Sequence, residues 1–356
     1  MNQLGVLRRT AIVLGIEVFM RVRKTPLRAG RITLRHSSDE GKIAAGLFSA
    51  ATAAGLVAWG FAVHLKAKRA ERDNPPIGRF IDVGGVRLHY LDQGKGDPIV
   101  LLHGNGSMVQ DFVGSGLVDF LAERYRVIVF DRPGFGYSER PRHRTWTPAA
   151  QAELLTKALR RLGVEETTII GHSWGTLPAI EMALLAPDQT RGLVLLSGHY
   201  YPEVRLDVAI LSTPAFPVVG DALRYTISPA LGRLLANRII RRLFAPRDEP
   251  PEFRTTFPVA MALRPSQLRA SAAESGLMLP VNSAAQKRYS ELTMPIAIIA
   301  GAEDRIVSVQ QSRRLHENVP DSALLIVPEA GHMVHYASPS EVVKAVDDIT
   351  SRSSGG

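Results

Sequence analysis

The sequence Gly-His-Ser-Trp-Gly at residues 171–175 limits the possible folds of this chain more than any other stretch. The β-branched run at 167–170 predicts a strand, and the apolar positions at 176–186 predict a helix. A serine on such a sharp strand-to-helix turn is lifted above the edge of a sheet. We therefore expect Ser173 to be exposed as a nucleophile.

The glycines that flank this serine support the same interpretation. A Cβ atom at Gly171 or Gly175 would crowd the adjoining strand and helix. The N–H that follows Ser173, that of Trp174, would then point at whatever the serine attacks. Short patterns also match by accident, so a Gly/Ser turn with a purely structural role remains an alternative for this motif taken alone.

Strand and helix patterns alternate along most of the chain. A hairpin is predicted around Gly84 and Gly85, and Thr147-Pro148 is a helix start signal. Such alternation is typical of an α/β fold with a mostly parallel sheet and helices on both faces. Further buried strands are predicted at 99–102, 127–130, 193–196, 296–299 and 324–327.

Residues 200–291 interrupt this alternation. The segment is too long for a loop, contains its own apolar helical patches and is punctuated by prolines. We expect a helical cap inserted over the site, between a first core part at 79–199 and a second at 292–350. No internal repeat is evident.

Four further motifs follow predicted strands. They are His-Gly-Asn-Gly at 103–106, Asp-Arg-Pro-Gly-Phe-Gly-Tyr-Ser at 131–138, Gly-Ala-Glu-Asp-Arg-Ile-Val at 301–307, and Gly331-His332. The carboxyl ends of parallel strands meet at one edge of a sheet, so these motifs and the serine should converge there.

With these five motifs in this order, the chain resembles the α/β-hydrolase family, in its serine esterase and lipase-like branch. The resemblance covers residues 79–350 except for the cap. The nucleophile, acid and base also follow that family's succession of Ser, Asp and His. The resemblance implies hydrolase chemistry without a cofactor.

The roles implied by the resemblance form a catalytic triad. Ser173 needs a base to remove its proton, and His332 is that base. Asp304 would orient the imidazole and stabilise its charged form. The backbone N–H groups of Asn105 and Trp174 would form the oxyanion hole.

Other polar residues near these motifs are expected to support the site. His103 and Gly104 would shape the first loop, His103 through a hydrogen bond. Asp131 and Arg132 are expected to brace their loop through backbone contacts.

The remaining titratable residues are given minor roles. Glu303 is expected to be a solvated carboxylate, His172 a packed turn residue, and His335 a rim or cap contact. No metal site is predicted, because the scattered histidines show no ligand spacing.

A serine at the turn favours acyl-enzyme chemistry on esters, thioesters, amides or cleavable diketones. We expect an ester-type bond in a small or lipid-like apolar substrate. Alternatives within the same fold are a carbon–carbon bond hydrolase, a cofactor-free haloperoxidase-like enzyme and an acyltransferase. A non-catalytic binding protein is the alternative of another class.

Composition limits the partners. With no cysteines among 356 residues, disulfides and thiolate sites are excluded. Residues 1–74 hold 13 Lys/Arg and 5 Asp/Glu, a net +8, whereas residues 75–356 hold 30 and 29, a net +1. Basicity confined to the N-terminal extension favours a membrane surface, and no nucleic-acid partner is expected. The sequence does not indicate an oligomeric state.

Residues 43–65 have the length and apolar character of a transmembrane helix. A signal peptide and an Ala-rich soluble helix are the alternatives. A basic arm at 1–42 precedes this single-pass anchor and a polar linker at 66–78 follows it; the side of the membrane is left open. Residues 351–356 are expected to be a frayed tail.

Overall fold

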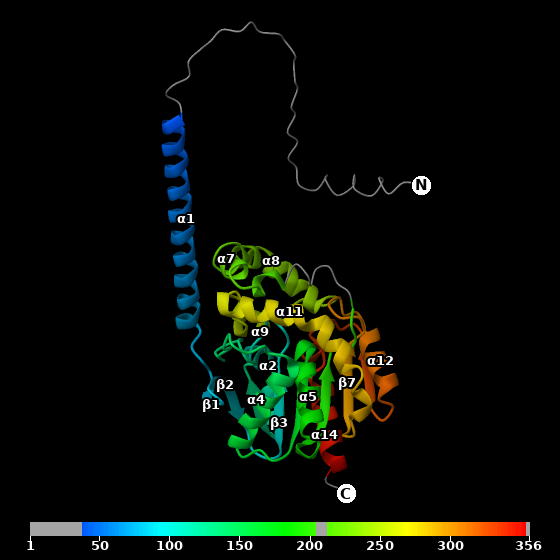
Figure 1. Cartoon of the computed structure of the whole chain (residues 1–356). Helices are drawn as coiled ribbons and strands as arrows, with labels where there is room; N and C mark the ends of the chain where they lie inside the picture. The colour runs from blue at the N-terminus through cyan, green and yellow to red at the C-terminus, as the bar shows by residue number, and fades with distance from the viewer. Residues whose placement is uncertain (1–37, 204–211, 354–356) are drawn as a thin grey trace, which may run out of the picture. The chain divides into compact units, whose positions relative to one another are not determined.

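The computed structural model describes residues 38–203 and 212–353. The chain divides into two units, Met1–Ala53 and Ala54–Gly356. The described part of the first unit is the beginning of helix α1 (Ser38–Asp73). The second unit contains the rest of α1, the sheet, and all the described helices after α1 (Figure 1).

An eight-stranded sheet forms the centre of the second unit, in the order β1-β2-β4-β3-β5-β6-β7-β8. β1 and β2 form the predicted hairpin, β2 pairs antiparallel with β4, and all the other pairs are parallel. The strands are β1 Arg79–Val83, β2 Val86–Gln93, β3 Pro98–Leu102, β4 Arg126–Phe130, β5 Thr167–His172, β6 Thr190–Leu196, β7 Ile296–Gly301 and β8 Ala323–Val327.

Helices cover both faces of this sheet, as predicted. Apolar side chains of α4, α5 and α12 pack on one face, and those of α2, α3 and α14 pack on the other. Both faces of the central strands are therefore dry, which explains their continuous apolar sequences. The helices of this core are α2 Gln110–Gly114, α3 Leu117–Ala122, α4 Pro148–Arg161, α5 Thr176–Leu185, α12 Gln310–Asn318, α13 Val334–Ala337 and α14 Pro339–Ser353, with short 3₁₀ turns η1 Ser173–Gly175 and η2 Pro187–Gln189.

The segment between β6 and β7 is helical, and we call it the cap. Helix α11 lies between the sheet and the outer helices α7 and α8 (Figure 1). Residues 204–211 of the predicted cap lie outside the described residues. The described elements are η3 Thr213–Ala215, α7 Val219–Tyr225, α8 Ile227–Phe244, α9 Pro251–Thr256, α10 Val259–Ala262, α11 Pro265–Ala285 and η4 Tyr289–Glu291.

Two predicted boundaries were wrong. The linker expected at 66–78 is helical as far as Asp73, because α1 continues through Lys68–Glu71 and Arg69–Asp73 pairs spaced three and four residues apart. Two prolines at 75 and 76 then prevent a further helical turn.

The tail expected at 351–356 is helical as far as Ser353, where α14 ends. The Ser351 hydroxyl donates to the Asp348 carbonyl at 3.2 Å, within this last turn. Residues 1–37 of the predicted basic arm and residues 354–356 of the tail lie outside the described residues.

Candidate active site

Ser173 lies on the predicted strand-to-helix turn, between β5 and α5, and is partly buried. Ser173 has a φ of 53°, in the left-handed region that few residues other than glycine adopt. A Cβ on Gly171 would lie 2.7 Å from the Gly175 carbonyl oxygen, and one on Gly175 would collide with the Leu102 carbonyl oxygen. Both glycines are therefore required for the close passage of β3, β5 and α5.

Ser173, His332 and Asp304 meet at the carboxyl ends of the strands. The Ser173 hydroxyl lies 2.9 Å from His332 Nε2, and His332 Nδ1 lies 2.8 Å from an Asp304 carboxylate oxygen. A carboxylate only accepts, so Nδ1 carries the proton and Nε2 keeps its lone pair toward the serine. The ring is thus oriented to take a proton from Ser173.

Asp304 is itself held in place by the loop that follows β7. Its other oxygen accepts hydrogen bonds from the backbone N–H groups of Ile306 at 2.7 Å and Val307 at 3.0 Å. The neighbouring Glu303 is exposed, in line with its predicted role as a solvated carboxylate. The two adjacent acids are thereby distinguished by geometry.

The loop after β3 lies against the serine. A Cβ on Gly104 would be 3.1 Å from the Ser173 Cβ, so only a residue without a side chain fits there without displacement. The Asn105 amide donates to the Ser271 carbonyl at 3.1 Å and to the Ser275 hydroxyl at 3.2 Å, both on α11. The cap therefore fixes the residue that was predicted to supply one oxyanion-hole N–H.

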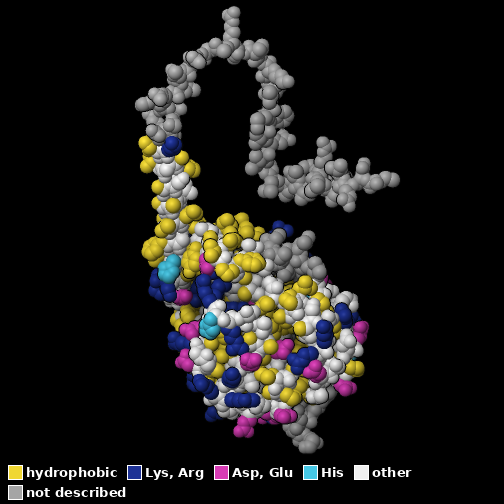
Figure 2. Space-filling view, viewed as in Figure 1, with side chains coloured by type: hydrophobic (Ala, Val, Ile, Leu, Met, Phe, Trp, Pro, Cys, Tyr) yellow, Lys and Arg dark blue, Asp and Glu magenta, His cyan; other side chains and the backbone are white. Residues whose placement is uncertain are grey.

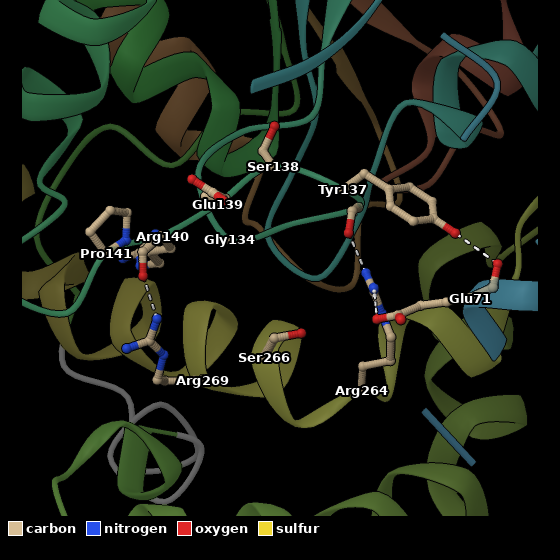
Figure 3. A pocket seen from close by; sticks show the side chains of 11 residues that line it. Glu71, Gly134, Tyr137, Ser138, Glu139, Arg140, Pro141, Arg264, Ser266 and Arg269 are labelled. Atoms are coloured by element: carbon tan, nitrogen blue, oxygen red, sulfur yellow. Dashed lines mark hydrogen bonds and ion pairs between the residues drawn. The ribbon is translucent and has the colours of Figure 1, made fainter. Parts of the chain in front are cut away.

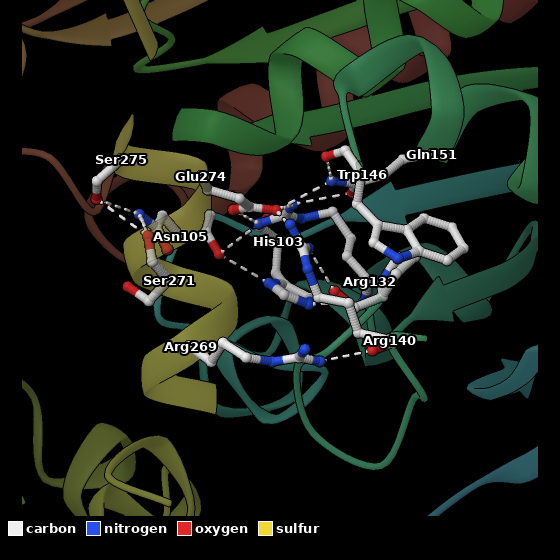
Figure 4. A network of polar contacts seen from close by, with 12 residues as sticks. His103, Asn105, Arg132, Arg140, Trp146, Gln151, Arg269, Ser271, Glu274 and Ser275 are labelled. Atoms are coloured by element: carbon white, nitrogen blue, oxygen red, sulfur yellow. Dashed lines mark hydrogen bonds and ion pairs between the residues drawn. The ribbon is translucent and has the colours of Figure 1, made fainter. Parts of the chain in front are cut away.

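Arg132 holds the same loop through several hydrogen bonds (Figure 4). Its guanidinium donates to the His103 carbonyl at 2.7 Å and the Gly104 carbonyl at 3.0 Å, and its own N–H donates to His103 Nε2 at 3.0 Å. Glu274 of α11 neutralises this arginine at 2.5 Å, and both side chains are fully buried. The predicted bracing role of Arg132 matches these contacts, whereas Glu274 was missed by the sequence analysis.

His103 takes part in this network as a neutral ring. Burial, reinforced by the nearby Arg132 charge, lowers the pKa of His103 to about 3. Its Nδ1 lies 2.8 Å from the Gly104 carbonyl, so this nitrogen carries the proton and Nε2 accepts from Arg132. The expected hydrogen-bonding role of His103 is present.

A second polar cluster is buried beside His332. His335 Nε2 lies 3.2 Å from Asp111, and His172 Nε2 lies 3.1 Å from the His332 carbonyl. The rim or cap position expected for His335 was wrong, because its ring is completely buried, while His172 is packed as predicted. Asp111 was not identified, since its partners lie far along the chain.

The electrostatics of this cluster keep Asp111 charged. Burial alone would raise the pKa of Asp111, but its contacts with His335, His172 and Ser107 outweigh that effect and lower it to about 2. Burial also lowers the pKa of His172 well below its usual value. The possible metal-ligand atoms of Asp111, His172 and His335 lie within 4.8 Å of one another, a grouping that sequence spacing did not indicate.

A cavity of about 470 Å³ lies between the loop 134–141 and the first turns of α11 (Figure 3). Its charged lining consists of Glu71, Glu139, Arg140, Arg264 and Arg269. None of the lining residues belongs to the Ser173, His332 and Asp304 group, so this cavity is separate from that site.

Comparisons with known proteins agree with this architecture. The model of the alpha/beta hydrolase fold matches residues 97–339, and the chain belongs to that family. The chain is 30% identical to a 2-hydroxymuconate semialdehyde hydrolase of Pseudomonas putida over 79% of this chain and 96% of that protein.

Two solved structures have the same fold. A thermophilic esterase from Thermogutta terrifontis matches with a TM-score of 0.65 and 22% identity, over 78% of this chain and 99% of that one. A membrane phospholipase A, a bacterial virulence factor, matches with a TM-score of 0.59 and 18% identity, over 89% and 100%.

Proposed function

We propose that this protein is a membrane-anchored serine hydrolase that cleaves an ester-type bond of a small or lipid-like apolar substrate. The observation that carries the proposal is the continuous hydrogen-bonded series from the Ser173 hydroxyl through His332 to Asp304. Three side chains from three loops do not need this alignment for packing alone. Nucleophilic catalysis requires it.

The proposed reaction begins when His332 Nε2 takes the Ser173 proton as the oxygen attacks the substrate carbonyl. Asp304 stabilises the resulting imidazolium. Collapse of the tetrahedral intermediate expels the alcohol, which receives the proton from His332 and leaves an acyl-serine. Water, activated by the same ring, then releases the acid and restores the serine.

Attack by the serine places negative charge on the substrate carbonyl oxygen, and hydrogen-bond donors that are already in position stabilise this charge. We assign this role to the backbone N–H groups of Trp174 and Asn105. The close approach of Gly104 to Ser173 and the fastening of Asn105 to α11 support the assignment. Loss of one such donor typically costs about 2.7–4 kcal/mol of transition-state stabilisation.

A membrane anchor is proposed for the apolar part of α1. The helical segment Lys42–Asp73 is long and apolar enough to cross a membrane, and only 6% of its most apolar window is buried by the rest of the protein. An apolar helix of a soluble core would instead be covered by other elements. This exposure supports an anchor over the soluble-helix alternative.

The test is hydrolysis of a short p-nitrophenyl ester by the full chain in detergent micelles. We expect turnover by the parent protein and its loss in Ser173→Ala, together with loss of covalent labelling by a fluorophosphonate. Equal turnover by the two proteins would refute the proposed nucleophile. Unchanged melting temperature would show that the variant is folded.

Carbon–carbon bond hydrolysis is a second candidate, favoured by the similarity to 2-hydroxymuconate semialdehyde hydrolase. The same Ser173 would serve both reactions. Parallel assays with a p-nitrophenyl ester and a ring-cleavage diketone separate them. A preference for the diketone of more than about a hundredfold in kcat/KM, worth about 2.7 kcal/mol, would replace the ester proposal.

A further inference from the structure

We infer that the outer face of the cap, formed by α7 and α8, rests on a phospholipid bilayer and admits substrate from it. This inference builds on the proposed anchor and names the source of the substrate. We define the outer face by its exposed large apolar side chains, which are Phe216, Val218, Val219, Tyr225, Ile227, Leu231, Leu234, Leu235 and Ile239.

Helix α8 is amphipathic in an unusual sense, because its apolar stripe faces outward. Ile227, Leu231, Leu234 and Leu235 recur at the spacing that places side chains on one helical face. Leu234 is 78% exposed, whereas the buried side chains of the helix are Ile240 and Phe244 on the other face. Yellow side chains accordingly gather over α7 and α8 in Figure 2.

The charge of α8 fits a phospholipid surface. Its sequence contains four arginines and no acidic residue. Arg238 and Arg242 lie on the same helical face as the apolar stripe, nearer the C-terminal end of the helix. Arg241 is exposed beside them. A helix with an apolar stripe and arginines near it is suited to the boundary between acyl chains and anionic headgroups.

The proposed anchor reaches this face. The Trp59 indole Nε1 donates to the Thr226 carbonyl at 2.9 Å, one residue before α8 begins. Leu56, Val57 and Phe61 on the same stretch of α1 are exposed. A bilayer that receives these apolar side chains therefore brings its headgroup region to the start of α8, where tryptophan is favoured.

The outer face is also connected to the reacting groups. At the end of α8 the Leu243 carbonyl accepts a hydrogen bond from the backbone N–H of His332 at 3.0 Å. On the inner side, α11 fastens Asn105. Helix α8, which would touch lipid, is thus hydrogen-bonded to the backbone of the proposed base. Helix α11 of the same cap holds Asn105, the proposed oxyanion-hole residue in the loop after β3. This arrangement favours an acyl ester dissolved in the bilayer as substrate.

The absence of cysteine makes a direct test possible. The full chain with Leu234→Cys is labelled at this cysteine with an environment-sensitive nitrobenzoxadiazole probe. The labelled protein is reconstituted in vesicles of phosphatidylcholine and phosphatidylglycerol at a low protein-to-lipid ratio. Lys157→Cys, on the exposed side of α4, is the matched control. Flotation with the vesicles and the melting temperature are measured for both.

We expect emission from position 234 to shift to shorter wavelength and to be quenched by lipids that carry a doxyl group on the acyl chain. Emission from position 157 should show neither effect. Emission at 234 equal to that at 157 would overturn the inference. A shift without lipid quenching would also overturn it, because protein, such as a second copy, would then cover the face.

A second measurement uses activity. The pair Leu231→Ser and Leu234→Ser should lower hydrolysis of p-nitrophenyl palmitate in vesicles about tenfold, because burial of apolar area drives interfacial contact. Hydrolysis of soluble p-nitrophenyl acetate should not change. Equal vesicle rates in parent and variant would argue against docking. Failure of both substrates in the parent would refute the proposed function instead, while the fluorescence result would still decide the docking.

Discussion

Glu303 and Asp304 are neighbouring residues that both carry a carboxylate, but their surroundings differ. Asp304 receives two backbone hydrogen bonds and contacts the imidazole of His332, whereas Glu303 faces solvent. We predict that Asp304→Asn lowers kcat for a p-nitrophenyl ester by about 10³–10⁴-fold, because the amide favours the wrong tautomer of His332. The measurement is the rate of p-nitrophenol release, followed by its absorbance.

Glu303→Gln is the matched control for that substitution and should leave kcat within about twofold, since exposed side chains contribute little. If Asp304→Asn retained parental kcat, the assignment of this residue as the acid would fail. Comparable loss in Glu303→Gln would move the assignment to the neighbour.

Buried neutral histidines predict how stability depends on pH. Burial lowers the pKa of His103 to about 3, while an unfolded histidine titrates near 6.5. Between these values the unfolded state binds more protons, so the free energy of unfolding falls as pH is lowered. The expected slope reaches about 1.4 kcal/mol per pH unit for this group.

The measurement is the denaturant midpoint of the full chain in micelles between pH 7 and pH 4. His172, whose pKa is also lowered by burial, adds to the same slope. A midpoint that stayed constant or rose on acidification would contradict the prediction.

At the scale of elements, the buried ion pair of Glu274 and Arg132 joins α11 to the loop after β4, and Arg132 in turn holds the loop after β3. We predict that Glu274→Gln destabilises the protein by about 3–5 kcal/mol, because it leaves the Arg132 charge buried without a counterion. Arg132 would then hold the His103 and Gly104 carbonyls less firmly, so kcat should also fall. Thermal melting and ester turnover report the two effects.

Glu252→Gln on α9 is the control, because that side chain is exposed. An unchanged melting temperature in Glu274→Gln would show that α11 does not depend on this pair.

The order of the elements was largely predictable because their signals are local. The runs at β3 and β5, the glycines around Ser173 and the start of α4 at Thr147 each depend on adjacent residues, and the Thr147 hydroxyl indeed caps the helix. The helical continuation of α1 was missed, because polar composition was interpreted as a linker although the charges pair along a helix.

Contacts between distant segments were not predictable from one sequence. Glu274 and Arg132 are 142 residues apart, and His335 and Asp111 are 224 apart. Nothing local distinguishes these residues from others of the same type. The Ser173, His332 and Asp304 group was found only because a family motif order links them.

For the whole molecule, the main expectation concerns the anchor. We predict that the full chain stays in the membrane pellet after alkaline carbonate extraction. Leu56→Arg together with Ala53→Arg should release it, because each charge costs about 2.5–3.5 kcal/mol at the centre of a membrane helix. Recovery of the parent chain in the supernatant would refute the anchor.

The hydrogen bond between Leu243 and His332 has a mechanical consequence. A helix compressed against a crowded monolayer would transmit that load to the backbone of His332, whereas a loosely packed film would leave it undisturbed. Turnover on a Langmuir trough should therefore vary with lateral pressure even when the amount of enzyme at the film is held constant.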